Sequence, residues 1–180
     1  MVRAAYPAAH RGNRRAVVIV GAGGPRSSRD ASGIPADSFQ RSLLRAKVRM
    51  DAFSQHVYPA AGPLQPTKAI PSWATLPVLL DALECARPGT PFFVTEAGYT
   101  TAPTPFRSVK VTPAQQALFL RQIFALPTVR NRVALVVWYQ LEDNPNWPGG
   151  LLRAGGSRKP SWKAFQSVAR RGSIPVILRR

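Results

Sequence analysis

The chain has 180 residues, 45% of them hydrophobic, so it is long enough for one domain with a buried core and too apolar to be disordered throughout. Its formal net charge of +17 is typical of proteins that meet nucleic acid, an anionic membrane surface or an acidic polymer. The basic residues are scattered, apart from residues 11–15 and 179–180, and no RNA-recognition, zinc-finger or basic-zipper motif accompanies them, which disfavours nucleic acid as the main partner.

The sequence shows no sign of a membrane span, a secretory signal or a metal site. No apolar run is long enough for a transmembrane helix. Residues 1–15 lack the apolar core of a signal peptide, so a cytoplasmic location is the default expectation. The single Cys85 forms no internal disulfide, and His10 and His56 are too few for a His-rich centre. We therefore expect no metal and no cofactor.

The chain begins with a basic segment over residues 1–15 that has no clear period and is expected to be irregular. Residues 16–21 form an apolar, β-branched run that predicts a buried strand. Gly and Ser dominate residues 21–33, which indicates a long loop. Its GAGG start lacks the third glycine and the following helix of a dinucleotide-binding fingerprint, so we expect no nucleotide site there.

Helical and strand patterns alternate along the rest of the chain. Apolar stripes predict helices over residues 36–47, 75–86, 112–125 and 161–169. Apolar runs predict strands over residues 50–56, 91–96 and 133–139. Thr112 and Gln115 form a capping-box pattern, and Thr75 is placed to cap the second helix. This order predicts an α/β fold with a parallel sheet and right-handed crossovers.

Polar and aromatic side chains stand where the predicted strands end. Glu96 closes one apolar run, His56 and Tyr58 close another, and Trp138 closes the last. Parallel α/β folds place ligands and catalysis at the carboxyl ends of their strands, so these residues are candidates for a functional site. Asp51 begins its strand, at the opposite end, and is expected to be structural.

Four segments, taken in order, resemble the C-terminal half of a (β/α)8-barrel retaining glycoside hydrolase, of the clan that includes cellulases, β-mannanases and β-xylosidases. DAFSQHVYP is similar to the sixth barrel strand, FFVTEAGY to the seventh and VALVVWYQLED to the eighth, while GGLLRAGGSRKPSWKAF is similar to the family's common ending. The resemblance implies a partial, half TIM barrel equivalent to strands 5–8. This domain is expected over residues 16–172, between the irregular N-terminal segment and a basic tail of residues 173–180.

The resemblance also implies a function: hydrolysis of O-glycosidic bonds in a polysaccharide or glycoside by a retaining mechanism. It assigns Glu96 as the nucleophile, and His56, Tyr58, Tyr99 and Trp138 as residues that bind the carbohydrate substrate. The family's acid/base is a glutamate that follows an asparagine at the end of the fourth strand, and no Asn-Glu pair occurs in this sequence. The reaction is therefore expected to be incomplete in this chain.

Other interpretations stay open at this stage. A half-barrel pairs with itself or with a separate N-terminal half, is a fragment, or persists only as a carbohydrate- or polymer-binding remnant. Glu142 and Asp143 follow the last predicted strand, yet nothing in the sequence sets either one about 5 Å from Glu96, as a second catalytic carboxyl requires. The competing function is that of a non-enzymatic basic protein that binds an anionic polymer, either nucleic acid or an acidic polysaccharide. Such binding should weaken steeply with salt, whereas sugar binding should not.

Overall fold

The computed structural model describes residues 2–24, 33–105 and 109–171. The elements in this part of the chain are α1 (Val2–Gly12), β1 (Ile19–Gly23), α2 (Ala36–Arg45), β2 (Ala52–Val57), α3 (Leu76–Ala86), β3 (Phe92–Ala97), α4 (Pro113–Ala125), α5 (Pro127–Arg132), β4 (Leu135–Trp138) and α6 (Pro160–Arg171). The strands pair in parallel in the order β1-β2-β3-β4. The expected α/β fold with a parallel sheet is confirmed.

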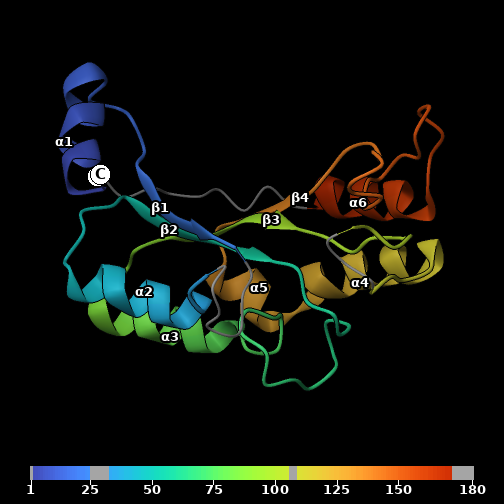
Figure 1. Cartoon of the computed structure of the whole chain (residues 1–180), viewed down its shortest axis with the longest axis horizontal. Helices are drawn as coiled ribbons and strands as arrows, with labels where there is room; N and C mark the ends of the chain where they lie inside the picture. Colours follow the sequence, from blue (N-terminus) through green and yellow to red (C-terminus); the bar gives the residue numbers. More distant parts are fainter. Residues whose placement is uncertain (1, 25–32, 106–108, 172–180) are drawn as a thin grey trace.

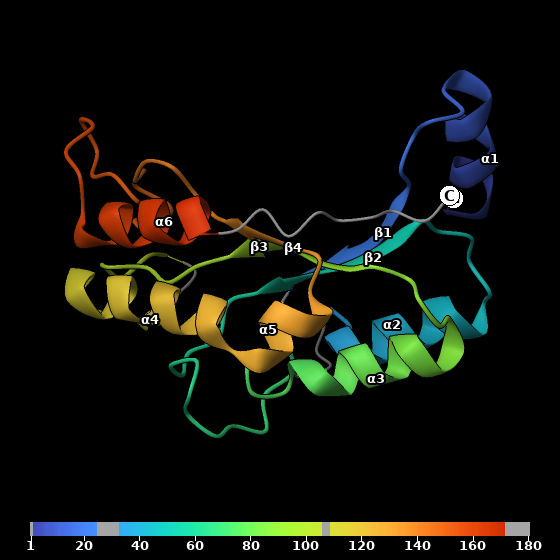
Figure 2. The ribbon, with the colours of Figure 1, turned by 180° about the vertical axis from the view of Figure 1, so that it is seen from behind.

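Most helices cover one face of the sheet. Figure 1 shows α2, α3, α5 and α4 beneath the strands, while α1 and α6 rise at the two ends of the opposite side. Figure 2 gives the same layers from behind, with α6 resting on α4. This is the arrangement that crossover connections produce when consecutive strands lie side by side.

The core lies between the sheet and the helices beneath it. Val20, Phe53 and Phe92 occupy paired positions on three neighbouring strands and belong to one buried cluster with Leu79 and Leu83 of α3. Each such side chain stabilises the fold by about 1.5–3 kcal/mol through burial. The apolar runs in the sequence thus become strands whose core-facing side chains pack against the helices beneath the sheet.

The predicted capping box of α4 is confirmed. The amide of Gln115 donates to Thr112 Oγ1 at 3.1 Å, and the Thr112 amide donates to Gln115 Oε1 at 2.8 Å. The expected cap of α3 is wrong: Thr75 stands at the N-cap position, but its Oγ1 accepts from the Ser72 amide at 3.1 Å and from no amide of the helix. An amide of the preceding loop thus occupies the acceptor oxygen that a cap would use.

Two stretches differ from the sequence expectation. Residues 2–12, expected to be irregular, form α1, and residues 127–132 form the short helix α5. The reason for α1 is tertiary: Tyr6 and His10, one turn apart, reach Asp51 with their hydroxyl and Nε2 at 2.9 and 3.3 Å. The local sequence pattern cannot predict contacts between residues that lie so far apart in the sequence. The expected basic tail, residues 173–180, lies outside the described residues.

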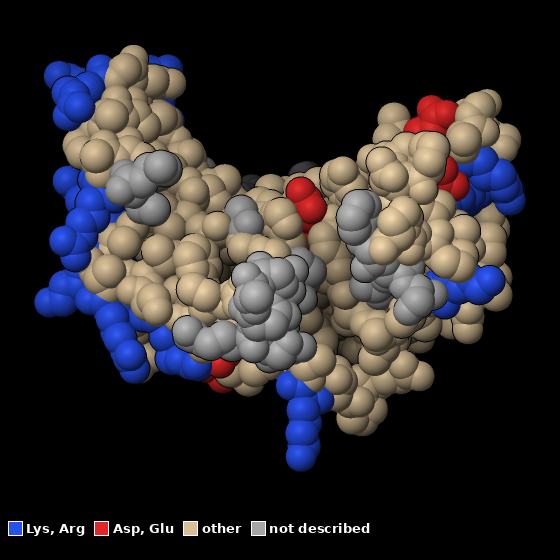
Figure 3. Space-filling model, viewed as in Figure 1, with Lys and Arg blue, Asp and Glu red and all other residues tan. Residues whose placement is uncertain are grey.

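The face of the sheet opposite α2, α3, α4 and α5, called here the open face, has exposed apolar side chains on both edge strands. Ile19 on β1 and Leu135 and Val137 on β4 are 42%, 43% and 40% exposed. Within the described residues, Ser54 Oγ and Thr95 Oγ1 of the two central strands are buried and have no hydrogen-bond partner. Figure 3 shows the surface hollowed between the two raised ends of the molecule. The exposed apolar side chains on both edge strands mark this face as incompletely covered.

No helix in the described ranges is long and apolar enough to cross a lipid bilayer.

Asp51 is the anchor of α1 and should make the fold sensitive to acid. Partial burial raises the pKa of this carboxyl, but hydrogen bonds from the Val18 amide, the Tyr6 hydroxyl and His10 outweigh it and hold the pKa below its ordinary value. The ionised carboxylate therefore stabilises the fold above the unfolded-state pKa of about 3.9, and this contribution is lost as the pH falls through the lower folded-state value.

We predict that Asp51→Asn lowers the free energy of unfolding by about 1 kcal/mol near neutral pH and has little effect in strong acid. Urea unfolding of both proteins over a series of pH values measures the gap. Asp37→Asn, which removes an exposed pair with Arg41, is the control and should cost only a few tenths of a kcal/mol. A gap of equal size at neutral and strongly acidic pH would contradict the anchoring role.

Candidate active site

Glu96 stands at the carboxyl end of β3, directly beside β2. The register pairs Gln55 with Val94 and then His56 with Glu96, so β3 holds one extra residue, Thr95, at this point. A bulge of this kind bends a strand and redirects the side chains that follow it. It allows the Glu96 carboxylate to meet side chains from the neighbouring strand.

Two groups converge on one oxygen of Glu96. The Tyr58 hydroxyl donates to Oε2 at 2.7 Å, and His56 Nδ1 lies 3.2 Å from the same atom. The Glu96 side chain remains 34% exposed, against 19% for His56. The carboxylate is thus held from one side and open to solvent on another, which suits a group that must reach a ligand.

Tyr58 remains a hydrogen-bond donor throughout the ordinary pH range. Burial of its ring raises the pKa of the phenol, and the hydrogen bond to Glu96 and the negative charge of that carboxylate raise it further. The phenol keeps its proton because ionisation would place two anions side by side.

Aromatic rings form a wall next to the carboxylate. The rings of Tyr58 and Trp147 lie 4.8 Å apart edge to face, and Tyr139 lies 6.0 Å from Trp147 and 6.4 Å from Tyr58. The Trp147 indole also donates to the Tyr139 carbonyl at 3.0 Å, which fixes its orientation. Aromatic faces beside a carboxylate offer stacking surface and polar edges together.

The remaining candidates are placed in the core. Trp138 is 7% exposed, and its indole donates to the Gly149 carbonyl at 3.1 Å. Tyr99 is 1% exposed, its hydroxyl donates to the Ala61 carbonyl at 3.0 Å, and its ring packs on Phe119. The structure therefore brings together Glu96, His56 and Tyr58, and buries the other two.

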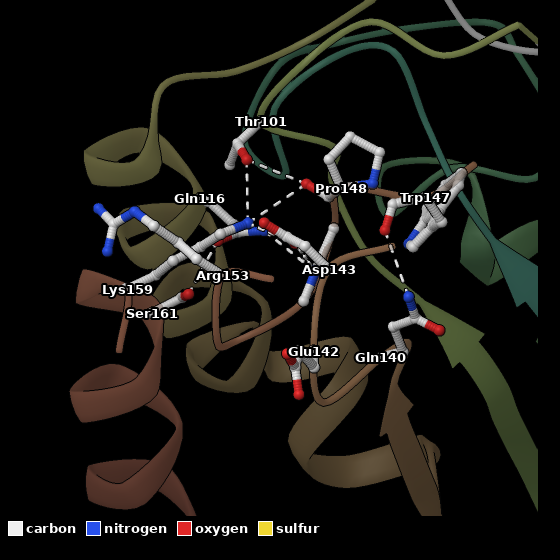
Figure 4. Close-up of polar contacts among 12 residues, drawn as sticks. Thr101, Gln116, Gln140, Glu142, Asp143, Trp147, Pro148, Arg153, Lys159 and Ser161 are labelled. Carbon is white, nitrogen blue, oxygen red and sulfur yellow. Dashed lines mark hydrogen bonds and ion pairs between the residues drawn. The ribbon is translucent and has the colours of Figure 1, made fainter. Parts of the chain in front are cut away.

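A buried ion pair holds the loop that carries Trp147. Lys159, with its side chain 2% exposed, donates from Nζ to Asp143 at 2.7 Å, to the Thr101 hydroxyl at 2.9 Å and to the Pro148 carbonyl at 3.3 Å. Figure 4 shows these partners converging on Nζ from the segment after β3 and the loop after β4. Three well-placed acceptors compensate the ammonium for its loss of water.

The buried side-chain amide of Gln116 links the same loop to α4 and α6. Gln116 donates to the carbonyls of Tyr99 and Gly149 at 2.8 and 3.1 Å, and its Oε1 accepts from the Ser161 hydroxyl at 2.8 Å. One side chain of α4 thus ties together the segment after β3, the loop after β4 and the start of α6. The loop is fixed in place by side chains rather than by regular secondary structure.

Two glycines permit the close packing of this loop. A Cβ at Gly98 would lie 2.7 Å from the Tyr139 carbonyl oxygen, and a Cβ at Gly149 would lie 2.3 Å from Trp147 Nε1. Both approaches are closer than any side chain tolerates, so these positions favour glycine. The aromatic wall depends on them.

The other described carboxylates are engaged away from Glu96. Their partners are as follows: Arg41 for Asp37, His10 and Tyr6 for Asp51, Arg132 for Asp81, the Gly89 amide for Glu84, the Gly155 amide for Glu142, and Lys159 for Asp143. No group of three or more His, Cys, Asp or Glu side chains in the described ranges is arranged to hold a metal ion. Glu96 is thus a single carboxylate with an imidazole and a phenol.

Parallel β/α units with these groups at the carboxyl ends of the strands make up part of a (β/α) barrel. The solved structures that resemble this arrangement are glycoside hydrolases, as the sequence resemblance implied. No protein-family model and no curated protein sequence matches the chain.

Three of the similar structures come from different glycoside hydrolase families. A GH39 β-xylosidase from Caulobacter crescentus is 21% identical with a TM-score of 0.52, over 76% of this chain and 30% of that one. A GH2 β-galacturonidase from Eisenbergiella tayi is 18% identical with a TM-score of 0.52, over 69% and 24%. A GH128 endo-β-1,3-glucanase from Amycolatopsis mediterranei is 21% identical with a TM-score of 0.51, over 76% and 53%.

These likenesses show the fold, which is that of a partial glycoside hydrolase barrel. The chain spans about a quarter to a half of the length of these three enzymes.

Sequence reasoning missed Tyr139 and Trp147. Tyr139 stands next to Trp138, and only the strand register decides which of the two rings is buried. Trp147 lies in a Pro- and Gly-rich loop, where its aromatic character was the only available signal.

We predict that Lys159→Met destabilises the protein by about 3–5 kcal/mol, because Asp143 keeps a buried charge without its partner. Arg41→Met, which removes an exposed pair on α2, is the matched control and should change stability by less than about 0.5 kcal/mol. Chemical denaturation followed by tryptophan fluorescence measures both. Equal, small effects of the two substitutions would show that the buried pair does not anchor the loop.

Proposed function

We propose that the chain carries the nucleophile side of a retaining glycosidase and that Glu96 is the nucleophile. The reaction is hydrolysis of O-glycosidic bonds in a β-linked polysaccharide or glycoside. The observation that carries the proposal is the convergence of Tyr58 and His56 on one oxygen of Glu96, at the carboxyl end of a sheet with a glycoside hydrolase fold. The names of the similar enzymes, all acting on β-glycosides, support the substrate class.

The geometry suits covalent catalysis. With Oε2 held by Tyr58 and His56, Oε1 is directed to the anomeric carbon. The carboxylate forms an ester bond to that carbon while the bond to the leaving oxygen breaks, and water then cleaves the ester in a second step. The hydrogen bond from Tyr58 and the contact with His56 Nδ1 orient the carboxylate for attack.

The proton donor comes from outside the described residues. A retaining glycosidase needs a second carboxyl about 5 Å from the nucleophile, and the other described carboxylates are engaged elsewhere. We propose that further β/α units, in the same chain or in a partner, complete the barrel and supply this acid. Without it, both the departure of the leaving group and the activation of water are slow, by typically 10²–10⁴-fold.

The sugar platform is proposed to be Tyr139 with Trp147. The sequence resemblance gave this role to Trp138, but Tyr139 is 37% exposed where Trp138 is 7% exposed. Tyr139 and Trp147 both contact the Tyr58 ring, so a sugar stacked on them lies next to the carboxylate. His56 and Tyr58 are proposed to bind the sugar as well as Glu96.

We predict that aryl β-glycosides with activated leaving groups convert the protein to a glycosyl-enzyme at Glu96, which accumulates because its hydrolysis lacks a base. Intact mass spectrometry should show the mass of one added glycosyl unit, with release of about one equivalent of phenol. Glu96→Gln should abolish both signals, and Glu84→Gln, an exposed carboxylate on α3, should change neither. Folded protein that releases no phenol from any sugar of the panel, or that is modified in Glu96→Gln, would refute the nucleophile assignment.

We predict that substitutions at two adjacent aromatic residues affect different properties, sugar binding for Tyr139 and thermal stability for Trp138. Tyr139→Ala should weaken the binding of the sugar by roughly tenfold, as expected for loss of one stacked ring, and leave the melting temperature nearly unchanged. Trp138→Phe should lower the melting temperature, because the hydrogen bond to Gly149 is lost, and leave sugar binding nearly unchanged. Isothermal titration with the best glycoside and thermal melts provide the two readouts. The reverse pattern would show that Trp138, and not Tyr139, forms the surface on which the sugar stacks.

A further inference from the structure

A second candidate site lies near the amino end of β2, at the end of the sheet away from Glu96. Arg45 ends α2, and Ala46, Lys47 and Arg49 lead into the amino end of β2, whereas Glu96 stands at a carboxyl end. Together with Arg3 of α1 these residues line an open pocket of about 430 Å³. Figure 3 shows Lys and Arg side chains gathered along the flank of the molecule formed by α1 and α2.

The pocket concentrates positive charge. Four of its five lining residues are cationic. Among the ion pairs of the described residues, none includes any of these four. Like charges held together in this way repel one another, and an anion in the pocket relieves that repulsion.

Two of the guanidinium groups are held in position. Arg3 donates to the Ala46 carbonyl at 3.0 Å, and the guanidinium of Arg49 lies 4.5 Å above the centre of the Tyr6 ring. Tyr6 is itself fixed by its bond to Asp51. Preorganised guanidinium groups bind oxyanions at a smaller entropic cost than mobile ones.

Lys47 occupies a backbone conformation that glycine adopts more easily. Its φ is 50°, and it follows the C-terminal end of α2, where glycine is the usual residue. A lysine here has a conformational cost that a glycine would avoid. Residues kept in such conformations cluster at functional sites, and here the ammonium group is what the lysine adds.

We propose that this pocket is a binding site for a ligand that carries two or more phosphate groups. Four cations call for a multiply charged anion, and phosphate carries more charge and more acceptor oxygens per group than carboxylate does. The planar guanidinium fork matches phosphate oxygens. The pocket volume lies in the range of ligand sites rather than of a single ion. The site is independent of Glu96 and of sugar hydrolysis.

Titration calorimetry of the full chain with sodium tripolyphosphate, at low and at moderate salt, tests the proposal. The test variant is the triple substitution Arg45→Gln, Lys47→Gln and Arg49→Gln. Its matched control is Arg121→Gln, Arg130→Gln and Lys163→Gln, which removes the same charges from exposed positions on α4, α5 and α6. The pocket variant should bind at least about tenfold more weakly than wild type, and the control within about threefold. Circular dichroism confirms that both variants fold.

Lys47→Gly provides a second readout. It should raise the melting temperature, because the backbone strain is relieved, and weaken tripolyphosphate binding by at least about threefold. Unchanged binding in Lys47→Gly, equal weakening in the two triple variants, or no binding by wild type would each overturn the proposal.

A single-stranded thymidine oligonucleotide distinguishes the source of the phosphates. Competition with tripolyphosphate, lost in the pocket variant alone, would assign the site to nucleic-acid phosphates. Tripolyphosphate binding without oligonucleotide competition would assign it to a free oligophosphate.

Discussion

The parallel pairing of β3 with its two neighbours is the constraint on which the rest of the structure depends. At its carboxyl end β3 holds one residue more than each neighbouring strand. Val94 and Ala97, three residues apart, pair with Gln55 and Val57 of β2, which are two apart. On the other side they pair with Val136 and Trp138 of β4, which are also two apart. The extra residue lets both Val94 and Ala97 join the core, although their spacing of three breaks the alternation of a regular strand. It also sets Glu96 opposite His56. Without it, Thr95 would take that position, and the carboxylate would be displaced from the imidazole.

The second requirement is a set of buried polar contacts that replaces regular structure after β4. Lys159 and Gln116 bind carbonyls and side chains of the loop that holds Trp147, and both are at most 3% exposed. Buried polar networks are costly unless every member has a partner, and for that reason they tolerate few alternative arrangements. The position of the aromatic wall is therefore defined by interactions outside the wall. A substitution at Lys159, distant in sequence from Glu96, acts on the site through this loop.

The sequence predicted those features that depend on local pattern. Apolar runs gave the strands, Thr112 and Gln115 gave a helix start, and the end of one run gave Glu96. Features that depend on long-range contacts were not predictable. α1 forms because Tyr6 and His10 meet Asp51. The choice between Trp138 and Tyr139 as the buried ring follows from the pairing of β4 with β3, since a shift of one residue exchanges the two faces of a strand, and no local pattern reports that register.

The proposed further β/α units would account both for the open face of the sheet and for the lack of a second carboxyl beside Glu96 among the described residues. Ile19 and Leu135 at the two sheet edges expose apolar surface, and Ser54 and Thr95 carry buried hydroxyls without partners among the described residues. Buried hydroxyls are normally hydrogen-bonded, and exposed apolar strand edges are normally covered or otherwise protected. Further parallel strands added to both edges would cover this apolar surface, bring acceptors to the hydroxyls and place new carboxyl ends at the rim where Glu96 stands. A second carboxyl delivered there would come from the same addition that satisfies the sheet. If further β/α units complete the barrel as proposed, stability and catalysis have one source, because in a closed barrel the strands that fill the interior also carry the site.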